Sequence, residues 1–203
     1  SHDLKAPLSS INGLINIAKY DVKEPVALEY FEKIENRIDR LNSFIKDIID
    51  LSRNSRLNIS TEEIDLKELI DTVIENNQYM ENASSIIFNV AINAEKRVVV
   101  DRARLEVILN NLISNSIKYH QSKGKRSIDI QMDMSDDSLY LKVQDNGIGI
   151  AADHIDRIFE MFYRGHEDYE GSGLGLYIVH DVVNKLGGSI QLNSAEGKGT
   201  TVE

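Results

Sequence analysis

Two adjacent residues near the start of the chain, His2 and Asp3, form a possible nucleophile and its proton acceptor. A neutral imidazole has one nitrogen free to attack phosphorus when its other nitrogen donates a hydrogen bond. Asp3 can accept that bond and take the Nδ1 proton of His2 as Nε2 reacts. A surface histidine beside an acid is also common without any such role, so the pair needs support from other segments.

Residues 110–119 carry a second group of polar side chains in a segment that otherwise has helical, apolar spacing. Asn111, Asn115, Lys118 and Tyr119 are spaced so that they share one helix face. Asparagine is a poor helix former, so the pair indicates a specific role, with a plain polar face as the alternative. An amide oxygen can ligate Mg²⁺, Lys118 can contact a phosphate, and Tyr119 can stack on a base.

A third segment, with Asp145, Gly147 and Gly149, directly follows a predicted strand. A buried aspartate at a strand end can accept a hydrogen bond from an exocyclic amine such as that of adenine. Glycines let the backbone approach a flat ligand closely. A simple turn into a helix would need one glycine, so this spacing favours a ligand site.

A glycine-rich run opens the last predicted helix, where backbone N–H groups and the helix dipole suit a phosphate. The run alone is weak evidence, because residues 163–170 before it are loop-like rather than a strand. Arg164 can reach a terminal phosphate, whereas Phe159 and Phe162 are interpreted as core aromatics of a short amphipathic helix. The short stretch at 164–170 predicts a compact lid that moves without nucleotide. The run consists of Gly171, Ser172, Gly173, Leu174, Gly175 and Leu176.

Residues 1–55 carry the heptad spacing of two helices, which would present His2. The break at 21–25 and Pro25 at the start of the second helix predict an antiparallel hairpin. A lone hairpin leaves apolar seams uncovered, so we expect two copies to form a dimeric four-helix bundle. The alternative is that the hairpin packs on its own C-terminal domain. The seams are Leu4, Leu8, Ile11, Ile15 and Ala18, then Ile34, Ile38, Leu41, Ile45 and Ile48.

The rest of the chain predicts an α+β sandwich, with one mixed sheet under a helical layer. We therefore expect two domains, residues 1–58 and 59–203. Helices are predicted at 65–80, 102–119 and 174–186, and strands at 85–93, 97–100, 127–134, 138–144 and as a pair within 188–203.

Composition narrows the function classes. The formal charge of -10 argues against nucleic acid or an anionic membrane as a partner. The absence of cysteine excludes disulfides and thiolate chemistry. The chain has no apolar run long enough for a membrane span and no signal peptide, so we expect a cytoplasmic setting without membrane contact. We also expect the sequence to be a fragment of a longer protein.

In this order along the chain, the motifs resemble those of the sensor histidine kinases of two-component systems. The H-box lies around His2, the N-box around Asn115, and the G1, F and G2 boxes at 145–149, 159–162 and 171–175. The resemblance implies a phosphotransfer hairpin followed by a Bergerat-type ATP-binding fold. It also implies that Asn115 ligates Mg²⁺, that Asp145 binds the adenine amine and that Tyr119 lies beside the base. Lys118 and Arg164 would contact the phosphates, and the glycines of the run would close a lid over them.

The same resemblance implies autophosphorylation of His2 and transfer to an aspartate on a response regulator receiver domain. ATP-hydrolysing relatives carry a glutamate where this chain has Asn111, which cannot act as a base, so ATPase activity is disfavoured. Many kinases carry Thr or Asn where this chain has Ala6, so we expect weak phosphatase activity towards the regulator. The rival interpretations are an ATPase of the gyrase or mismatch-repair type, a degenerate kinase acting as a scaffold, and a nucleic-acid binder, which the charge opposes.

Overall fold

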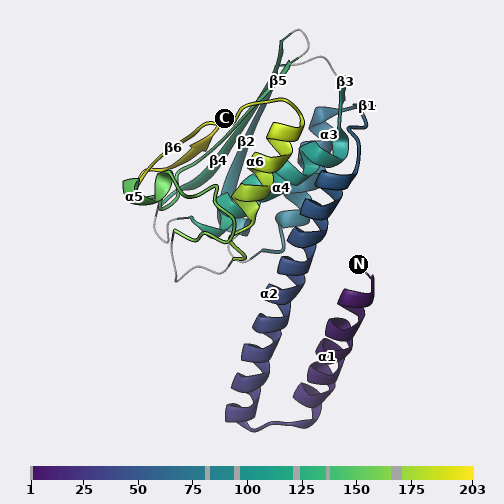
Figure 1. Cartoon of the computed structure of the whole chain (residues 1–203). Coiled ribbons are helices and arrows are strands. Elements are labelled where there is room, and N and C mark those ends of the chain that lie inside the picture. The colour runs from purple at the N-terminus through teal and green to yellow at the C-terminus, as the bar shows by residue number, and fades with distance from the viewer. Residues whose placement is uncertain (1, 81–82, 94–96, 121–123, 136–137, 166–170) are drawn as a thin grey trace.

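The computed structural model describes residues 2–80, 83–93, 97–120, 124–135, 138–165 and 171–203. Of residues 2–5 only the backbone is described. Helix α1 (His2–Asp21) and helix α2 (Pro25–Arg56) form a long hairpin below an α/β domain (Figure 1). Pro25 occupies the first turn of α2, where its missing N–H costs no helical hydrogen bond. The predicted hairpin is therefore confirmed.

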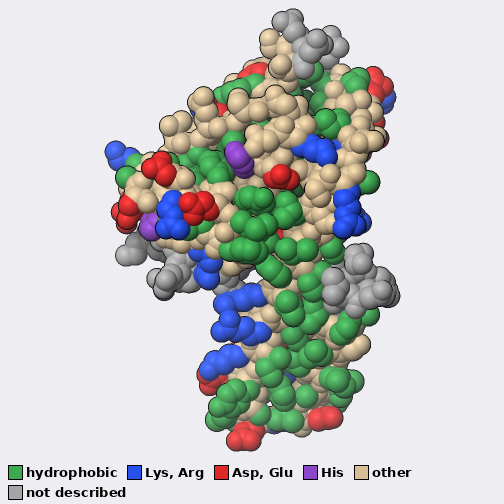
Figure 2. Space-filling view, in the orientation of Figure 1, with side chains coloured by type: hydrophobic (Ala, Val, Ile, Leu, Met, Phe, Trp, Pro, Cys, Tyr) green, Lys and Arg blue, Asp and Glu red, His purple; other side chains and the backbone are tan. Residues whose placement is uncertain are grey.

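The hairpin covers only part of its own apolar seams. Leu8, Ile15 and Ile38 are buried, with Phe31 and Ile45 packed against them. Figure 2 shows hydrophobic side chains exposed along the hairpin on the face in view. One copy thus leaves apolar surface uncovered, as the heptad pattern predicted. The exposed seam residues are Ile11, Ile34, Leu41 and Ile48.

The α/β domain contains a five-stranded sheet in the order β2-β4-β5-β7-β6. Strands β2 and β4 pair in parallel, whereas the other neighbours pair antiparallel, so the predicted mixed sheet is confirmed. Helices α3, α4 and α6 form the layer that packs on this sheet (Figure 1). The bounds are α3 Leu66–Asn77, β2 Ile86–Asn93, α4 Arg102–Lys118, β4 Arg126–Ser135, β5 Ser138–Asp145, α6 Gly175–Lys185, β6 Leu192–Ala195 and β7 Gly199–Val202.

Three short features differ from the sequence-based expectations. The strand predicted at 97–100, observed as β3 (Val98–Val100), lies outside the main sheet and pairs antiparallel with β1 (Glu62–Ile64). Helix α5 (Ala152–Ile155) and the 3-10 turn η1 (Ala83–Ser85) were not predicted. Elements of three or four residues are too short to show a hydrophobic period, which explains why the sequence did not reveal them.

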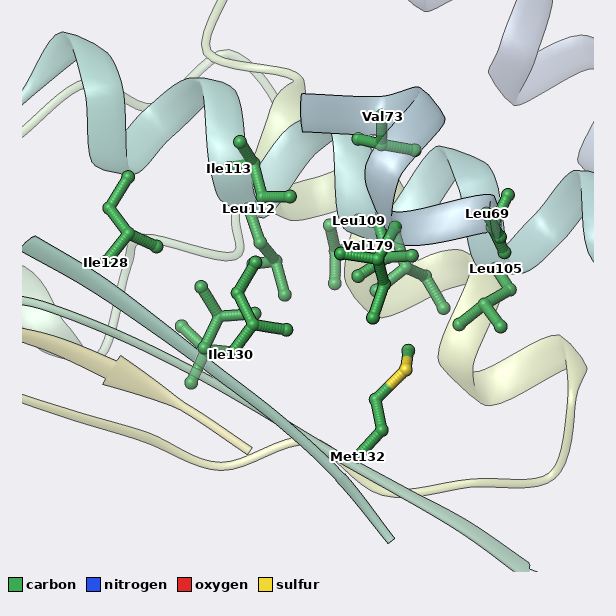
Figure 3. Packing of buried hydrophobic residues seen from close by; sticks show 14 of the residues in the cluster. Leu69, Val73, Leu105, Leu109, Leu112, Ile113, Ile128, Ile130, Met132 and Val179 are labelled. Atoms are coloured by element: carbon green, nitrogen blue, oxygen red, sulfur yellow. The ribbon is translucent and has the colours of Figure 1, made fainter. Parts of the chain in front are cut away.

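The core of the domain lies between the helical layer and the sheet (Figure 3). Leu109 and Ile113 of α4 are fully buried and face Ile130 and Met132 of β4. Helices α3 and α6 add Leu69, Val73 and Val179 to the same cluster. Because one side of α4 is fixed in this core, its opposite side is held in a defined orientation.

A buried polar cluster joins the end of α2 to α4. Arg104 donates from Nε to Asn54 Oδ1 at 2.8 Å and from a terminal nitrogen to the Leu57 carbonyl at 2.8 Å. Its guanidinium also pairs with Asp101, the N-cap of α4. Asn54 in turn donates to Asp181 of α6 at 2.7 Å. The last turn of α2 is thus bound to two helices of the α/β domain.

None of the helices in the described part of the chain is both long and apolar enough to span a membrane.

Candidate functional site

Helix α4 presents its polar face to a cavity of about 840 Å³. Asn111, Asn115 and Lys118 line it, together with Tyr119 just after the helix. Asn111 uses Nδ2 to donate to the Val107 carbonyl at 2.8 Å, which orients its amide. The four predicted side chains are therefore brought together at one cavity, as their spacing indicated.

Glycine at 175 is required by the approach of α6 to this polar face. A Cβ on Gly175 would lie 2.9 Å from Asn111 Oδ1 and 3.7 Å from Asn115 Nδ2. The missing side chain therefore lets the first turn of α6 pack closely against both amides. Amide oxygens beside a helix N-terminus form a polar environment suited to a phosphate and its cation.

Asp145, at the end of β5, lines the same cavity and is held by three donors. Its Oδ1 accepts from Gly147 N at 2.8 Å and Thr200 N at 3.2 Å, and its Oδ2 accepts from Ser116 Oγ at 3.1 Å. Burial raises the pKa of Asp145, and these hydrogen bonds partly offset that rise. The result is a carboxyl group with a fixed orientation at the wall of the cavity. Ser116 and Thr200 were not identified from the sequence.

The two glycines after Asp145 are needed mainly by the protein's own backbone. A Cβ on Gly147 would lie 2.3 Å from the Tyr119 carbonyl oxygen. Gly149 has φ +69°, and its Cβ would lie 2.0 Å from the Ala195 carbonyl oxygen. Gly149 lines the cavity, whereas Gly147 is not among the described lining residues and acts on Asp145 through its N–H.

The glycine-rich run lies along another wall of the cavity, and Arg164 lines it as well. Leu174, in contrast, is fully buried in the core and does not line the cavity among the described residues. Of the predicted lid, residues 166–170 lie outside the described residues. The lining members of the run are Gly171, Ser172, Gly173, Gly175 and Leu176.

The segment at 159–164 does not form the expected amphipathic helix. Residues 159–162 form turns and a bend, and Phe162 is 54% exposed with φ 65°. Phe162 N donates to the Gly173 carbonyl at 3.0 Å, and a Cβ on Gly173 would lie 2.7 Å from Phe162 C. The interpretation of Phe162 as a core aromatic is therefore wrong, because this close backbone pairing turns its ring outward.

Helix α2 supplies a wall that sequence reasoning missed. Asp47 and Asn54 of this helix line the cavity together with residues of the α/β domain. Burial lowers the pKa of Lys118, and the charge of Asp47 partly opposes that effect. Contacts between segments so far apart in sequence leave no periodic signal that could have predicted them.

The side chains of His2 and Asp3 lie outside the described residues, so their geometry at the cavity is not part of the structure. Their backbone lies in the first turn of α1. The packing of Leu8 against α2 fixes the side of the hairpin on which this turn begins.

Comparison with known proteins agrees with this arrangement. Residues 100–203 match the family of histidine kinase-, DNA gyrase B- and HSP90-like ATPases, and residues 1–57 match the His Kinase A (phospho-acceptor) domain. The methanogenesis regulatory histidine kinase FilI of Methanothrix harundinacea is 32% identical over 206 residues, which cover 100% of this chain and 23% of FilI. Sensor histidine kinase WalK of Bacillus subtilis is 26% identical, over 100% of this chain and 34% of WalK.

Solved structures share the fold. Full-length ShkA in complex with AMPPNP has a TM-score of 0.75 at 24% identity, over 99% of this chain and 43% of ShkA. The histidine kinase AdeS of Acinetobacter baumannii has a TM-score of 0.68 at 24% identity, over 100% of this chain and 96% of that one. This chain spans about a quarter to a third of the length of the curated relatives described above. With both family matches in the order hairpin then ATPase domain, the chain belongs to the sensor histidine kinases of two-component systems.

Proposed function

We propose that this chain is the catalytic core of a sensor histidine kinase that transfers the γ-phosphoryl group of ATP to His2. One observation carries the proposal: polar and glycine residues from four separate segments line a single cavity, in a chain whose first 57 residues match a phospho-acceptor domain. Residues 1–58 would serve dimerisation and phosphotransfer, and residues 59–203 would bind ATP.

Asp145 is the proposed adenine contact. Its two oxygens are oriented by Gly147, Ser116 and Thr200, and a carboxylate oxygen can accept a further bond from the exocyclic amine. Tyr119 lines the cavity nearby and offers an aromatic surface to the base.

The phosphates are proposed to lie between α4 and the N-terminus of α6. Lys118 and Arg164 would supply positive charge, and the lining glycines Gly171, Gly173 and Gly175 would supply backbone donors. Asn115 lines the cavity and would hold Mg²⁺ through its amide oxygen, a ligand type that this ion accepts. When bound, the ion would neutralise phosphate charge and orient the triphosphate.

The proposed reaction uses His2 and Asp3 directly. Nε2 of His2 forms a bond to the γ-phosphorus while the bond from that phosphorus to the bridging oxygen breaks, releasing ADP. Asp3 accepts the proton from Nδ1 of His2. Asn111 has an amide instead of a carboxylate, so water activation and simple ATP hydrolysis are disfavoured.

The proposed partners are a second copy of the chain and a response regulator receiver domain. The exposed seam residues of α1 and α2 support a homodimer, because pairing two hairpins would bury them in a four-helix bundle. Ala6, exposed on α1, offers no hydrogen-bonding side chain, so dephosphorylation of the regulator should be weak. Rapid loss of regulator phosphate in the presence of the ADP-bound protein would contradict this assignment.

Labelling with γ-labelled ATP and Mg²⁺ tests the proposed kinase activity. Wild type should acquire an acid-labile, alkali-stable label, and His2→Gln and Asn115→Ala should not. His180→Gln is the matched control, since this histidine on α6 is not among the described residues that line the cavity, and it should label as wild type does. Acid-stable label, or label that survives His2→Gln, would refute the assigned nucleophile.

A further inference from the structure

The side of α2 that faces the α/β domain closes part of the cavity. Ser172 Oγ, in the glycine-rich run, donates to Asp47 Oδ2 at 2.5 Å. One turn earlier on α2, Phe44 contacts Phe162, with ring centroids 6.3 Å apart. Both contacts connect α2 to residues beside the proposed phosphate site, where the nucleotide and α2 would meet.

Phe162 is held in a conformation that suits this contact. Its φ of 65° is unusual for a bulky side chain and persists only where surrounding structure imposes it. Pairing with Gly173 fixes the backbone, and the exposed ring then packs on Phe44. Phe162 and Ser172 therefore form one small surface that fits α2.

Asp47 also opposes the proposed ligand electrostatically. It lines the cavity with Lys118, and the two side chains attract each other. Burial raises the pKa of Asp47, and the hydrogen bond from Ser172 and the positive charges of Lys118 and Lys46 partly offset this rise, while the charge of Asp50 adds to it. A triphosphate bound at Lys118 would place several negative charges beside this poorly solvated carboxylate.

The arrangement of the helices separates the phospho-acceptor helix from the cavity. Helix α1 packs against α2, through Leu8 and Ile38. In Figure 1, α1 lies on one side of α2 and helices α4 and α6 lie on the other. With α2 docked in this way, it stands between the start of α1 and the proposed ATP site of the same chain.

We propose that Asp47 is an inhibitory latch, which holds Ser172 and pairs electrostatically with Lys118 so that ATP binding and docking of α2 on the cavity oppose each other. The inference rests on the proposed function, because it requires the cavity to bind ATP. Coupling between two equilibria is reciprocal: if docking weakens ATP binding, ATP weakens docking by the same factor. ATP would thereby release the domain that must reach a histidine.

Nucleotide affinity provides the first test. Asp47→Asn keeps the shape of the side chain and an acceptor for Ser172 but removes the charge. It should bind a non-hydrolysable ATP analogue at least about fivefold more tightly than wild type, within the usual range of coupling between sites. Asp39→Asn, at an exposed position on the same helix, makes the same change in net charge and should leave the affinity unchanged. Equal affinity of wild type and Asp47→Asn would overturn the latch.

Docking can be measured separately, because the natural chain contains no cysteine. Cysteines introduced at Ser55 and Lys185, where the lysine Nζ donates to the Ser55 carbonyl at 3.2 Å, would report docking by the rate of bridging with a short bis-maleimide. The ATP analogue should slow bridging, and Asp47→Asn should slow it without nucleotide. A rate unaffected by either change would overturn the inference while leaving ATP binding intact. Failure of every variant to bind the analogue would instead overturn the proposed function, and the latch with it.

Discussion

Replacing Arg104 with methionine should strongly destabilise the junction between α2 and the α/β domain. The guanidinium pairs with Asp101 and donates to the carbonyls of Leu57 and Asn58 at 2.8 and 3.2 Å. Side-chain exposure is 8% for Arg104 and 3% for Asp101, so water cannot readily replace these bonds. Methionine keeps much of the side-chain volume while removing the charge and every side-chain donor.

The magnitude follows from what would remain unpaired. Removing one partner of a buried ion pair costs about 3–5 kcal/mol, because the other charge stays buried. Asp101 would keep two backbone donors, Ser60 N and Arg104 N, each at 3.0 Å. The loss should therefore lie near the lower end, at about 3 kcal/mol of the free energy of unfolding.

Urea denaturation followed by circular dichroism would measure this loss of stability. Arg97→Met is the matched control, since Arg97 forms a surface pair with Glu63 at 3.4 Å, with side chains 65% and 59% exposed. That substitution should cost less than about 1 kcal/mol. A loss below about 1 kcal/mol for Arg104→Met would refute the reasoning, since the buried pair would then behave like a surface one.

Three further substitutions test the cavity and the core. Gly175→Ala should displace the Asn111 amide and so weaken binding of an ATP analogue about tenfold or more, a factor worth about 1.4 kcal/mol. The thermal midpoint should stay within a few degrees of wild type. Titration calorimetry and a melting curve would measure the two effects, and unchanged affinity would contradict the proposed site. Because burial raises the pKa of Asp145 above the ordinary 3.8, the folded protein binds this proton more tightly than the unfolded chain. The stability of the folded protein should therefore fall as pH rises from 3.8 through the raised pKa of Asp145. Urea denaturation of wild type and Asp145→Asn at several pH values should show a smaller fall in the variant. Equal falls in the two proteins would argue against a buried carboxyl at this position. Leu109→Ala, at a fully buried position, should lower the free energy of unfolding by about 2–5 kcal/mol, and a loss below 1 kcal/mol in urea denaturation would indicate that the core collapses around it.

Helical and strand periodicity predicted the main elements because long amphipathic segments repeat their signal. The helix expected at 102–119 is observed as α4, with Leu105 and Leu109 buried as predicted. Strands β4 and β5 pair antiparallel, as the turn predicted from the sequence at 135–137 implied. In each case, local spacing and burial on one face specify the same structure, so no long-range information was needed.

The cavity was only partly predictable. Asn111, Asn115 and Lys118 share a helix face, so their spacing alone indicated that they would lie together at one site, and they line one cavity. Asp47 gave no such signal, because its place at the cavity depends on how α2 docks on a domain far along the chain. The outward ring of Phe162 likewise depends on its backbone pairing with Gly173, which no propensity describes.

The unbroken course of α2 has a mechanical consequence. This helix runs for 32 residues from the turn at 22–24 to the cluster around Arg104. At about 1.5 Å of rise per residue it is a rod about 48 Å long, so a tilt of about 10° at one end would swing the other by about 8 Å. While α2 is docked and its far end is bound to α4 and α6, such a lever would carry the whole α/β domain with it, so that a small movement at the base of the hairpin becomes a large displacement of the cavity.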